Sequence, residues 1–121
     1  MTMKKKIRQF ETGATRDTNE GKLDYEAFLS PLVLVRYAEY MDKHRVQPDG
    51  SIREGDNWQN LFGDKHLNVC MKSATRHFMS WWLNHRGETK KVNEDIEESV
   101  CALIFNANAY LFKILKDKDA G

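Results

Sequence analysis

The 121-residue sequence lacks three features, and each absence excludes a class of protein. No apolar run approaches the roughly 18 residues that cross a bilayer, so we expect no interaction with a membrane. The basic N-terminal run MKKKIR has no hydrophobic segment after it, which excludes a secretory signal and favours a solvated tail over a binding arm. The formal net charge is only +1, so the overall charge does not favour a nucleic-acid duplex as partner.

Several motifs of enzymes and metal sites are missing as well. Cys70 and Cys101 form no CxxC pattern and both lie in apolar helical contexts, which favours two buried free thiols over a disulfide. The chain contains no Gly-rich phosphate loop, no Ser–His–Asp motif and no HExxH. A P-loop enzyme and a zinc peptidase are therefore disfavoured.

The sequence does contain helical periodicity, in three segments. Ser30 is an N-cap candidate before Pro31, and the apolar spacing that follows predicts a helix over 31–45. A second helix is predicted over 67–85 and a third over about 94–116. Between the first two, turn-forming residues indicate either a functional loop or a short hairpin around Pro48-Asp49-Gly50.

Two wide apolar stripes, one of them with paired tryptophans, exceed what three helices can bury among themselves. We therefore predict an all-α fold, in which three main helices per chain form a bundle that is completed in a homodimer or a higher homo-oligomer. Residues 1–12 are predicted to be an N-terminal tail, and residues 13–121 a single all-α domain that begins with an extended segment.

Acidic residues cluster on two of the predicted helices. Glu39 and Asp42 share one face of the first helix. Four acids crowd the first turn of the third helix: Glu94, Asp95, Glu97 and Glu98. Carboxylates from facing helices suit hard divalent cations, which prefer oxygen ligands. The helix dipole also favours acids at an N-terminus, so an ordinary exposed acidic surface is the alternative interpretation.

Polar residues beside tryptophans supply two further candidates. Arg76 and His77 precede a pair of tryptophans. Arg76 would hold a phosphate in a two-point contact, and His77 would hydrogen-bond a base or a phosphate. The alternative is that Arg76 forms a structural ion pair and His77 is a satisfied histidine at an interface. Asn57 and Trp58 lie in a polar loop, where the indole either stacks on a base or anchors the loop.

Two asparagines, Asn106 and Asn108, lie inside the otherwise apolar third helix. A buried amide must find hydrogen-bond partners. We therefore expect one asparagine to face a ligand pocket and the other to be exposed or at an interface.

Six segments occur in an order that resembles one known family. They are TGATRDTNEGKLDYEAFLSPLVL, YMDKHR, DGSIREGDNWQ, CMKSATRHFMSWW, HRG and IEESVCALIFNANAYL. Together they resemble the phage and prophage dATP/dGTP diphosphohydrolases, a branch of the all-α, MazG-like nucleotide pyrophosphohydrolases. The resemblance covers roughly residues 13–115. It implies an oligomer in the cytoplasm of an infected or lysogenic bacterial host, with a nucleotide as ligand between helices.

The resemblance also implies roles for individual residues. Mg²⁺ or Mn²⁺ would be bound by Glu39, Glu97 and Glu98, with Glu39 and Glu98 catalytic. An activated water would then attack a phosphorus atom and release pyrophosphate and a nucleoside monophosphate. The nucleotide would contact the residues that match the family's polar motifs: Arg16, Asp17, Lys22, Asp24, Asn57, Trp58, Arg76, His77 and Asn106.

The stretch GATRDTNEGKLDY, residues 13–25, carries four of these positions. Its composition alone is that of a disordered tail. The resemblance instead predicts an ordered extended segment that packs over the helices or over a neighbouring subunit's pocket. Arg16 and Lys22 would face phosphates, whereas Asp17 and Asp24 would orient them or help to hold a cation.

Departures from the family pattern leave three functions open. Val35 replaces an expected glutamate, Ser80 replaces an expected aspartate, and NLF replaces a KGI-like stretch after NWQ. The leading expectation is a metal-dependent pyrophosphohydrolase of purine deoxynucleoside triphosphates. The alternative is a catalytically inactive relative that sequesters a host immune signal, such as a cyclic oligonucleotide or a cyclic ADP-ribose isomer. The third is an interaction protein without a ligand.

Overall fold

The computed structural model describes residues 7–9, 13, 15–17, 21–61 and 63–120, the strand residues 7–9 and 15–17 by their backbone only. The chain divides into two units, Met1–Leu34 and Val35–Gly121. The three long helices that the sequence predicts are all present, and they make up most of the second unit. The all-α fold class is therefore confirmed.

The first unit contains a small strand pair and one turn of helix. Strand β1 (Ile7–Gln9) pairs antiparallel with β2 (Thr15–Asp17). Helix α1 (Tyr25–Phe28) follows, and the carboxylate of Asp24 accepts a hydrogen bond from the amide of Ala27 at 3.1 Å. Asp24 is thus an N-cap, which satisfies an amide that the helix itself leaves without a partner.

Helix α2 (Pro31–Lys43) begins as the sequence predicts. The Ser30 hydroxyl accepts a hydrogen bond from the Val33 amide at 3.3 Å, which confirms the N-cap. The helix ends two residues earlier than expected. The Arg45 amide bonds to the Asp42 carbonyl at 3.2 Å, so the chain leaves α2 through a tighter last turn.

A short hairpin follows α2. Val46 bridges Ile52 in antiparallel fashion, and the Gln47 amide donates to the Ser51 carbonyl at 2.8 Å. Gly50 has φ 87°, a left-handed conformation that glycine adopts without steric cost. The hairpin around Pro48-Asp49-Gly50 is therefore confirmed.

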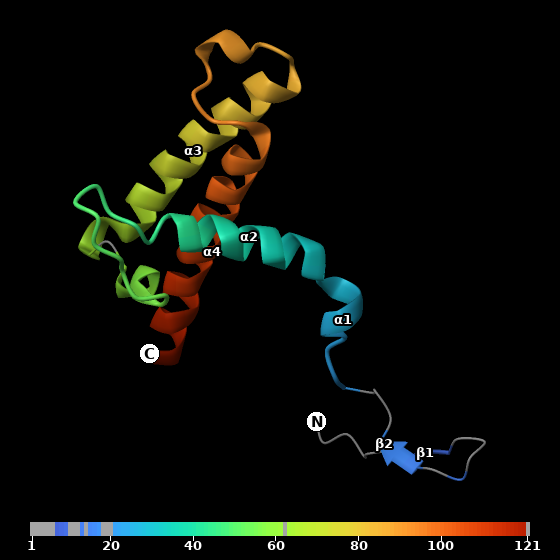
Figure 1. Ribbon diagram of the computed structural model, residues 1–121. Helices are drawn as coiled ribbons and strands as arrows, with labels where there is room; N and C mark the ends of the chain where they lie inside the picture. The colour runs from blue at the N-terminus through green and yellow to red at the C-terminus, as the bar shows by residue number, and fades with distance from the viewer. Residues whose placement is uncertain (1–6, 10–12, 14, 18–20, 62, 121) are drawn as a thin grey trace. The chain divides into compact units, whose positions relative to one another are not determined.

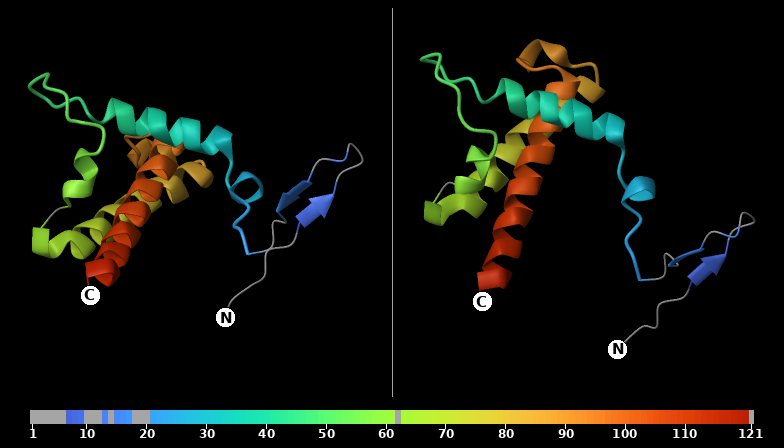
Figure 2. Two further views of the ribbon diagram at one scale, coloured as in Figure 1. Left: turned by 90° about the horizontal axis from the view of Figure 1, so that it is seen from below. Right: turned by 60° about the horizontal axis from the view of Figure 1, so that its bottom comes forward.

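Two 3₁₀ turns, η1 (Asn57–Asn60) and η2 (Gly63–Lys65), lead into helix α3 (His66–His85). After η3 (Thr89–Lys91), helix α4 (Ile96–Ala120) returns beside α3, and α2 from Val35 onward crosses α4 (Figure 1). Both further views show the same α3–α4 hairpin (Figure 2). Gly87, with φ 73°, follows the end of α3 in the left-handed conformation that glycine commonly adopts after a helix.

The hydrophobic core lies between α2 and α4, and a second buried region lies between α3 and α4. Tyr40 of α2 is buried against Cys101 and Ala102 of α4, and Phe105 packs on this cluster. Five further residues of the helix pair α3 and α4 are buried: His66, Cys70, Ser99, Asn106 and Ala109. Cys70 and Cys101 are free and buried, which confirms the expectation of two free thiols.

Helix α4 is long and apolar. By length and composition alone it is the one helix among the described residues that could span a membrane. In the structure it packs against α3 and carries the polar residues Ser99 and Asn106 in its buried face. The expectation that the chain does not bind a membrane stays a prediction.

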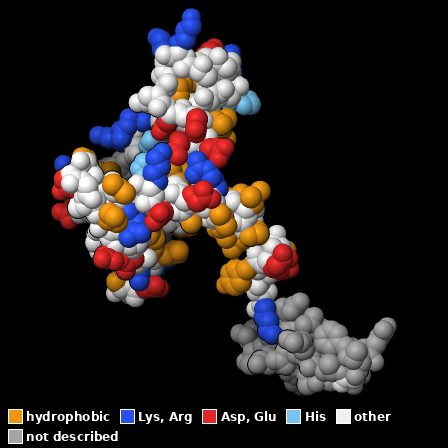
Figure 3. Space-filling model, viewed as in Figure 1, with side chains coloured by type: hydrophobic (Ala, Val, Ile, Leu, Met, Phe, Trp, Pro, Cys, Tyr) orange, Lys and Arg blue, Asp and Glu red, His pale blue; other side chains and the backbone are white. Residues whose placement is uncertain are grey.

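Apolar side chains also remain on the surface. They gather over α1 and the beginning of α2 (Figure 3), where Phe28 and Leu32 are 75% and 81% exposed. No residue of α1 is buried. Single exposed apolar residues are common, but a continuous group of them marks an interaction surface.

Candidate functional site

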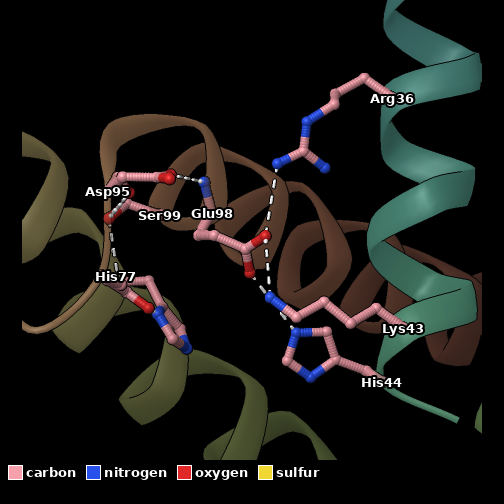
Figure 4. Close-up of polar contacts among 8 residues, drawn as sticks. Arg36, Lys43, His44, His77, Asp95, Glu98 and Ser99 are labelled. Atoms are coloured by element: carbon pink, nitrogen blue, oxygen red, sulfur yellow. Dashed lines mark hydrogen bonds and ion pairs between the residues drawn. The ribbon is translucent and has the colours of Figure 1, made fainter.

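Glu98 is the centre of an ion-pair cluster between α4 and α2 (Figure 4). Its carboxylate accepts a hydrogen bond from the Arg36 guanidinium at 3.3 Å. Lys43 Nζ and His44 Nε2 each lie 3.6 Å from its oxygens. Arg36 also donates from Nε to the neighbouring Glu97 at 2.7 Å. The first turn of α4 is therefore tied to α2 by several charged groups at once.

The charges of this cluster reinforce one another. Burial disfavours the ionised form of Glu98, but the hydrogen bond from Arg36 and then the charge of Lys43 outweigh it, and the pKa of Glu98 falls below its usual value. The hydrogen bond to Glu97 raises the pKa of Arg36 above its usual value, with a smaller contribution from Glu98. Glu98 and Arg36 are thus both charged at neutral pH.

The predicted metal ligands do not come together in a metal-binding group. Within the described part of the chain, no three His, Cys, Asp or Glu side chains are placed to hold one ion. Glu98 is held by basic groups, and Glu97 is paired with Arg36. Glu39 is exposed and has no ion pair with another described residue. The donor set as arranged does not fit Mg²⁺ or Mn²⁺, and metal binding stays a prediction.

A second polar group joins α3 to the beginning of α4. His77 Nδ1 lies 2.8 Å from the Glu94 carboxylate, which also accepts from the Ser99 hydroxyl at 3.1 Å. Asp95 accepts from the Glu98 amide at 2.8 Å, so it caps the beginning of α4. His77 therefore has a partner at the beginning of α4, and its contact with a nucleotide stays a prediction. Arg76 is exposed and pairs with no other described residue.

A cavity of about 510 Å³ adjoins the Glu98 cluster, with which it shares His44. Aromatic side chains form one part of its lining: Tyr40, Trp58 and Phe105. Polar and charged side chains, one of them acidic, form the other part: His44, Arg45, Arg53, Glu54, Asn57 and Asn60. Concave sites of this size that combine apolar walls with a few convergent polar groups are typical of small-molecule binding.

The two arginines in the cavity differ in how they are held. Arg45 donates from Nε to the Arg53 carbonyl at 2.6 Å and from its terminal nitrogen to Asp42 at 2.9 Å. The Arg53 side chain is exposed and has no hydrogen bond or ion pair to any described group. Arg53 is thus a cation that can receive an anion without first losing a partner.

The aromatic side chains that line the cavity also contact other rings. The Trp58 ring meets Phe112 of α4 edge to face, with centroids 4.8 Å apart. The Tyr40 ring lies 4.2 Å from that of His44, at 42°. Burial, and then the charge of Glu98, raise the pKa of Tyr40 to about 12, so its hydroxyl remains a hydrogen-bond donor at neutral pH.

A smaller cavity of about 320 Å³ lies next to the first and shares Met41, Arg45 and Trp58 with it. Asn108 and Tyr37 belong to its lining. The Tyr37 hydroxyl is buried and has no hydrogen-bond partner among the described residues, which is uncommon for a buried polar group.

The structure brings only some of the predicted nucleotide-binding residues together. Asn57 and Trp58 line the larger cavity. Asn106 is buried and donates to the Ala102 carbonyl of its own helix at 2.8 Å, so Asn108 is the asparagine that lines a cavity. Lys22 is exposed. The side chains of Arg16 and Asp17 lie outside what the structure describes, and so does any contact they make.

Sequence reasoning missed most of the cavity's basic lining. Arg45 and Arg53 lie eight residues apart, on either side of the Pro48-Asp49-Gly50 turn. The Arg53 amide donates to the Arg45 carbonyl at 2.9 Å, because the hairpin folds its two sides together. The sequence signal that could have identified this basic lining is a pair of arginines on either side of a predicted hairpin turn.

A comparison of the chain with protein-family models, curated proteins and solved structures found no significant match.

The Glu98 cluster predicts a pH-dependent contribution to stability. We expect Glu98→Gln to lower the free energy of unfolding by about 1–2 kcal/mol at pH 7. Folding lowers the pKa of Glu98, so its contribution is complete above the ordinary glutamate pKa of about 4.3 and is lost as the pH falls through the folded value. Thermal melts of both proteins from pH 7 to pH 3 measure this.

The matched control is Glu39→Gln, which removes an exposed carboxylate on α2 that pairs with no other described residue. It should change the stability by less than about 0.5 kcal/mol. A difference between wild type and Glu98→Gln that stays constant down to pH 3 would contradict the role of the Glu98 charge.

Proposed function

We propose that this chain binds a nucleotide in the larger cavity. The observation that carries the proposal is the combination of Arg53, a cation without a partner among the described residues, with the aromatic rings of Tyr40 and Trp58 in one concave site. A guanidinium group binds phosphate oxygens in a two-point contact, and aromatic rings stack on a base. The resemblance of the sequence to nucleotide pyrophosphohydrolases supports the same class of ligand.

The parts of a nucleotide correspond to different parts of the lining. Phosphates would lie at Arg53 and Arg45, and the base beside Trp58. The side-chain amides of Asn57 and Asn60 supply donors and acceptors that a sugar or a base edge can use. The cavity's volume of about 510 Å³ falls within the range of about 300–1,000 Å³ that is usual for ligands of this size.

Of the two nucleotide functions, we place sequestration before hydrolysis. The carboxylates expected to hold a metal are instead neutralised by Arg36 and Lys43. The host immune signals named above have the phosphates and purine rings that this cavity suits. Hydrolysis of purine deoxynucleoside triphosphates with Mg²⁺ or Mn²⁺, which the resemblance of the sequence implies, is the second candidate.

The test begins with melting temperatures of the protein alone and with each purine deoxynucleoside triphosphate, a cyclic dinucleotide or a cyclic ADP-ribose isomer. Each ligand is tested in EDTA and with Mg²⁺ or Mn²⁺. A ligand at 100 times its dissociation constant stabilises the folded state by about 2.7 kcal/mol, which raises the melting temperature by several degrees. We expect at least one of them to do so in EDTA.

The fate of the bound ligand then separates the two candidates. Recovery of the intact nucleotide after incubation with metal supports sequestration, whereas release of pyrophosphate supports hydrolysis. If no nucleotide shifts the melting temperature under any condition, the proposal fails and the chain is better described as an interaction protein without a nucleotide ligand.

A further inference from the structure

Among the residues that the structure describes, Leu23–Leu34 is the stretch with the most exposed apolar side chains, and we call it the apolar segment. Seven of its large apolar side chains are between 50% and 81% exposed: Leu23, Tyr25, Phe28, Leu29, Leu32, Val33 and Leu34. At these exposures each presents on the order of 100 Å² of apolar surface. Their sum is larger than the 300–600 Å² or so of the largest apolar patch on a typical monomer.

The apolar segment does not have the one-sided pattern of a surface helix. Leu32, Val33 and Leu34 follow one another in α2, and successive residues of a helix point about 100° apart. Exposed apolar side chains therefore face several directions around the helix. A helix that is apolar on several sides is stable in water only when another surface encloses it.

A second apolar surface lies on α3, and we call it the α3 face. It consists of Met71, Phe78 and Trp82, which are 57%, 44% and 48% exposed. Their spacing of seven and four residues places them on one stripe of the helix. Phe78 and Trp82 also contact each other, with ring centroids 6.0 Å apart, so they present a joined aromatic surface.

From these two surfaces we infer that the chain forms a homodimer by exchange, in which the apolar segment of each copy packs on the α3 face of the other. A second copy supplies two apolar contacts of the same kind, and the two-fold symmetry of a dimer makes both at once. One side of a standard stable interface buries about 800 Å², which the apolar segment and the α3 face of one chain together supply.

The oligomeric state of the full chain tests this inference. Size-exclusion chromatography with light scattering should give twice the 14.1 kDa mass of one chain. The double variant Phe28→Asp/Leu32→Asp disrupts the apolar segment, and Trp82→Asp disrupts the α3 face. Each should weaken the dimer by roughly 100-fold or more, because every dimer contains the damaged contact twice. Asn68→Asp adds one negative charge at another exposed position of α3 and should leave the dimer intact.

Mixing the two dissociated variants distinguishes exchange from other arrangements. A mixed dimer has one intact contact, between the apolar segment of the Trp82→Asp chain and the α3 face of the other chain. We therefore expect the 1:1 mixture to recover dimers that neither variant forms alone. Circular dichroism of each variant shows whether its helices are folded, and the Asn68→Asp protein supplies the folded reference.

Three results would overturn the inference. One is a wild-type protein that remains monomeric at 100 µM or so, above the dissociation constant of an interface of this size. Another is a double variant of the apolar segment that dimerises as tightly as the wild type, which would mean that the α3 faces pair with each other. The third is a mixture of two folded variants that stays monomeric.

Discussion

Reversing the charge of Arg53 is expected to weaken nucleotide binding by about 100-fold. Arg53 lines the larger cavity and has no partner within the described part of the chain, so its whole charge is available to a phosphate. In Arg53→Glu, the new carboxylate would repel the phosphate that the guanidinium attracts. Isothermal titration calorimetry with the nucleotide that stabilises the wild type most measures the loss.

The matched control is Arg86→Glu, the same change at an exposed arginine that follows α3 and does not line the larger cavity. It should change the affinity by less than about threefold at 150 mM salt, where exposed charges beyond about 8 Å are largely screened. Equal losses in both variants would mean that the general charge of the protein, and not a contact in the cavity, attracts the nucleotide.

Replacing His66 with alanine is expected to lower the free energy of unfolding by about 3 kcal/mol. His66 is fully buried at the beginning of α3, and its Nε2–H donates to the Ala109 carbonyl of α4 at 2.9 Å. The substitution removes this bond across the helix pair and leaves a space that the helices only partly refill. For a chain of this size, the melting temperature should fall by roughly 10 °C.

His85→Ala provides the comparison, because His85 ends the same helix but is exposed. Its effect should stay within about 0.5 kcal/mol. Thermal unfolding followed by circular dichroism measures both variants. A loss below 1 kcal/mol or so in His66→Ala would show that the seam between α3 and α4 does not depend on this contact.

The helices of this chain were predictable from local patterns. Ser30 with Pro31, and Gly87, mark helix ends by chemistry that acts within a few residues, and the structure has the caps at these positions. The hairpin around Gly50 was predictable as one of two alternatives for the same reason. The end of α2 was not predictable in this way, because the Arg45 guanidinium at that end donates to the Arg53 carbonyl, which the following hairpin brings close.

The candidate site was only partly predictable. Trp58 was identified because an aromatic residue in a polar loop is unusual, and it lines the cavity. Asn106 was assigned to the ligand by motif, but it is buried with a partner in its own helix. A motif names a residue type at a position, and does not say which neighbours compete for its hydrogen bonds.

The sequence by itself determined the helical class, the helix starts and the free state of both thiols, because capping, periodicity and the spacing of cysteines can be read from short stretches of chain. Only the tertiary structure decided what the charged residues do. Glu98 looked like a metal ligand, yet the crossing of α2 over α4 brings Arg36, Lys43 and His44 to its carboxylate. Electrostatic roles depend on distances of a few ångströms between residues far apart in the chain, and those distances exist only after folding.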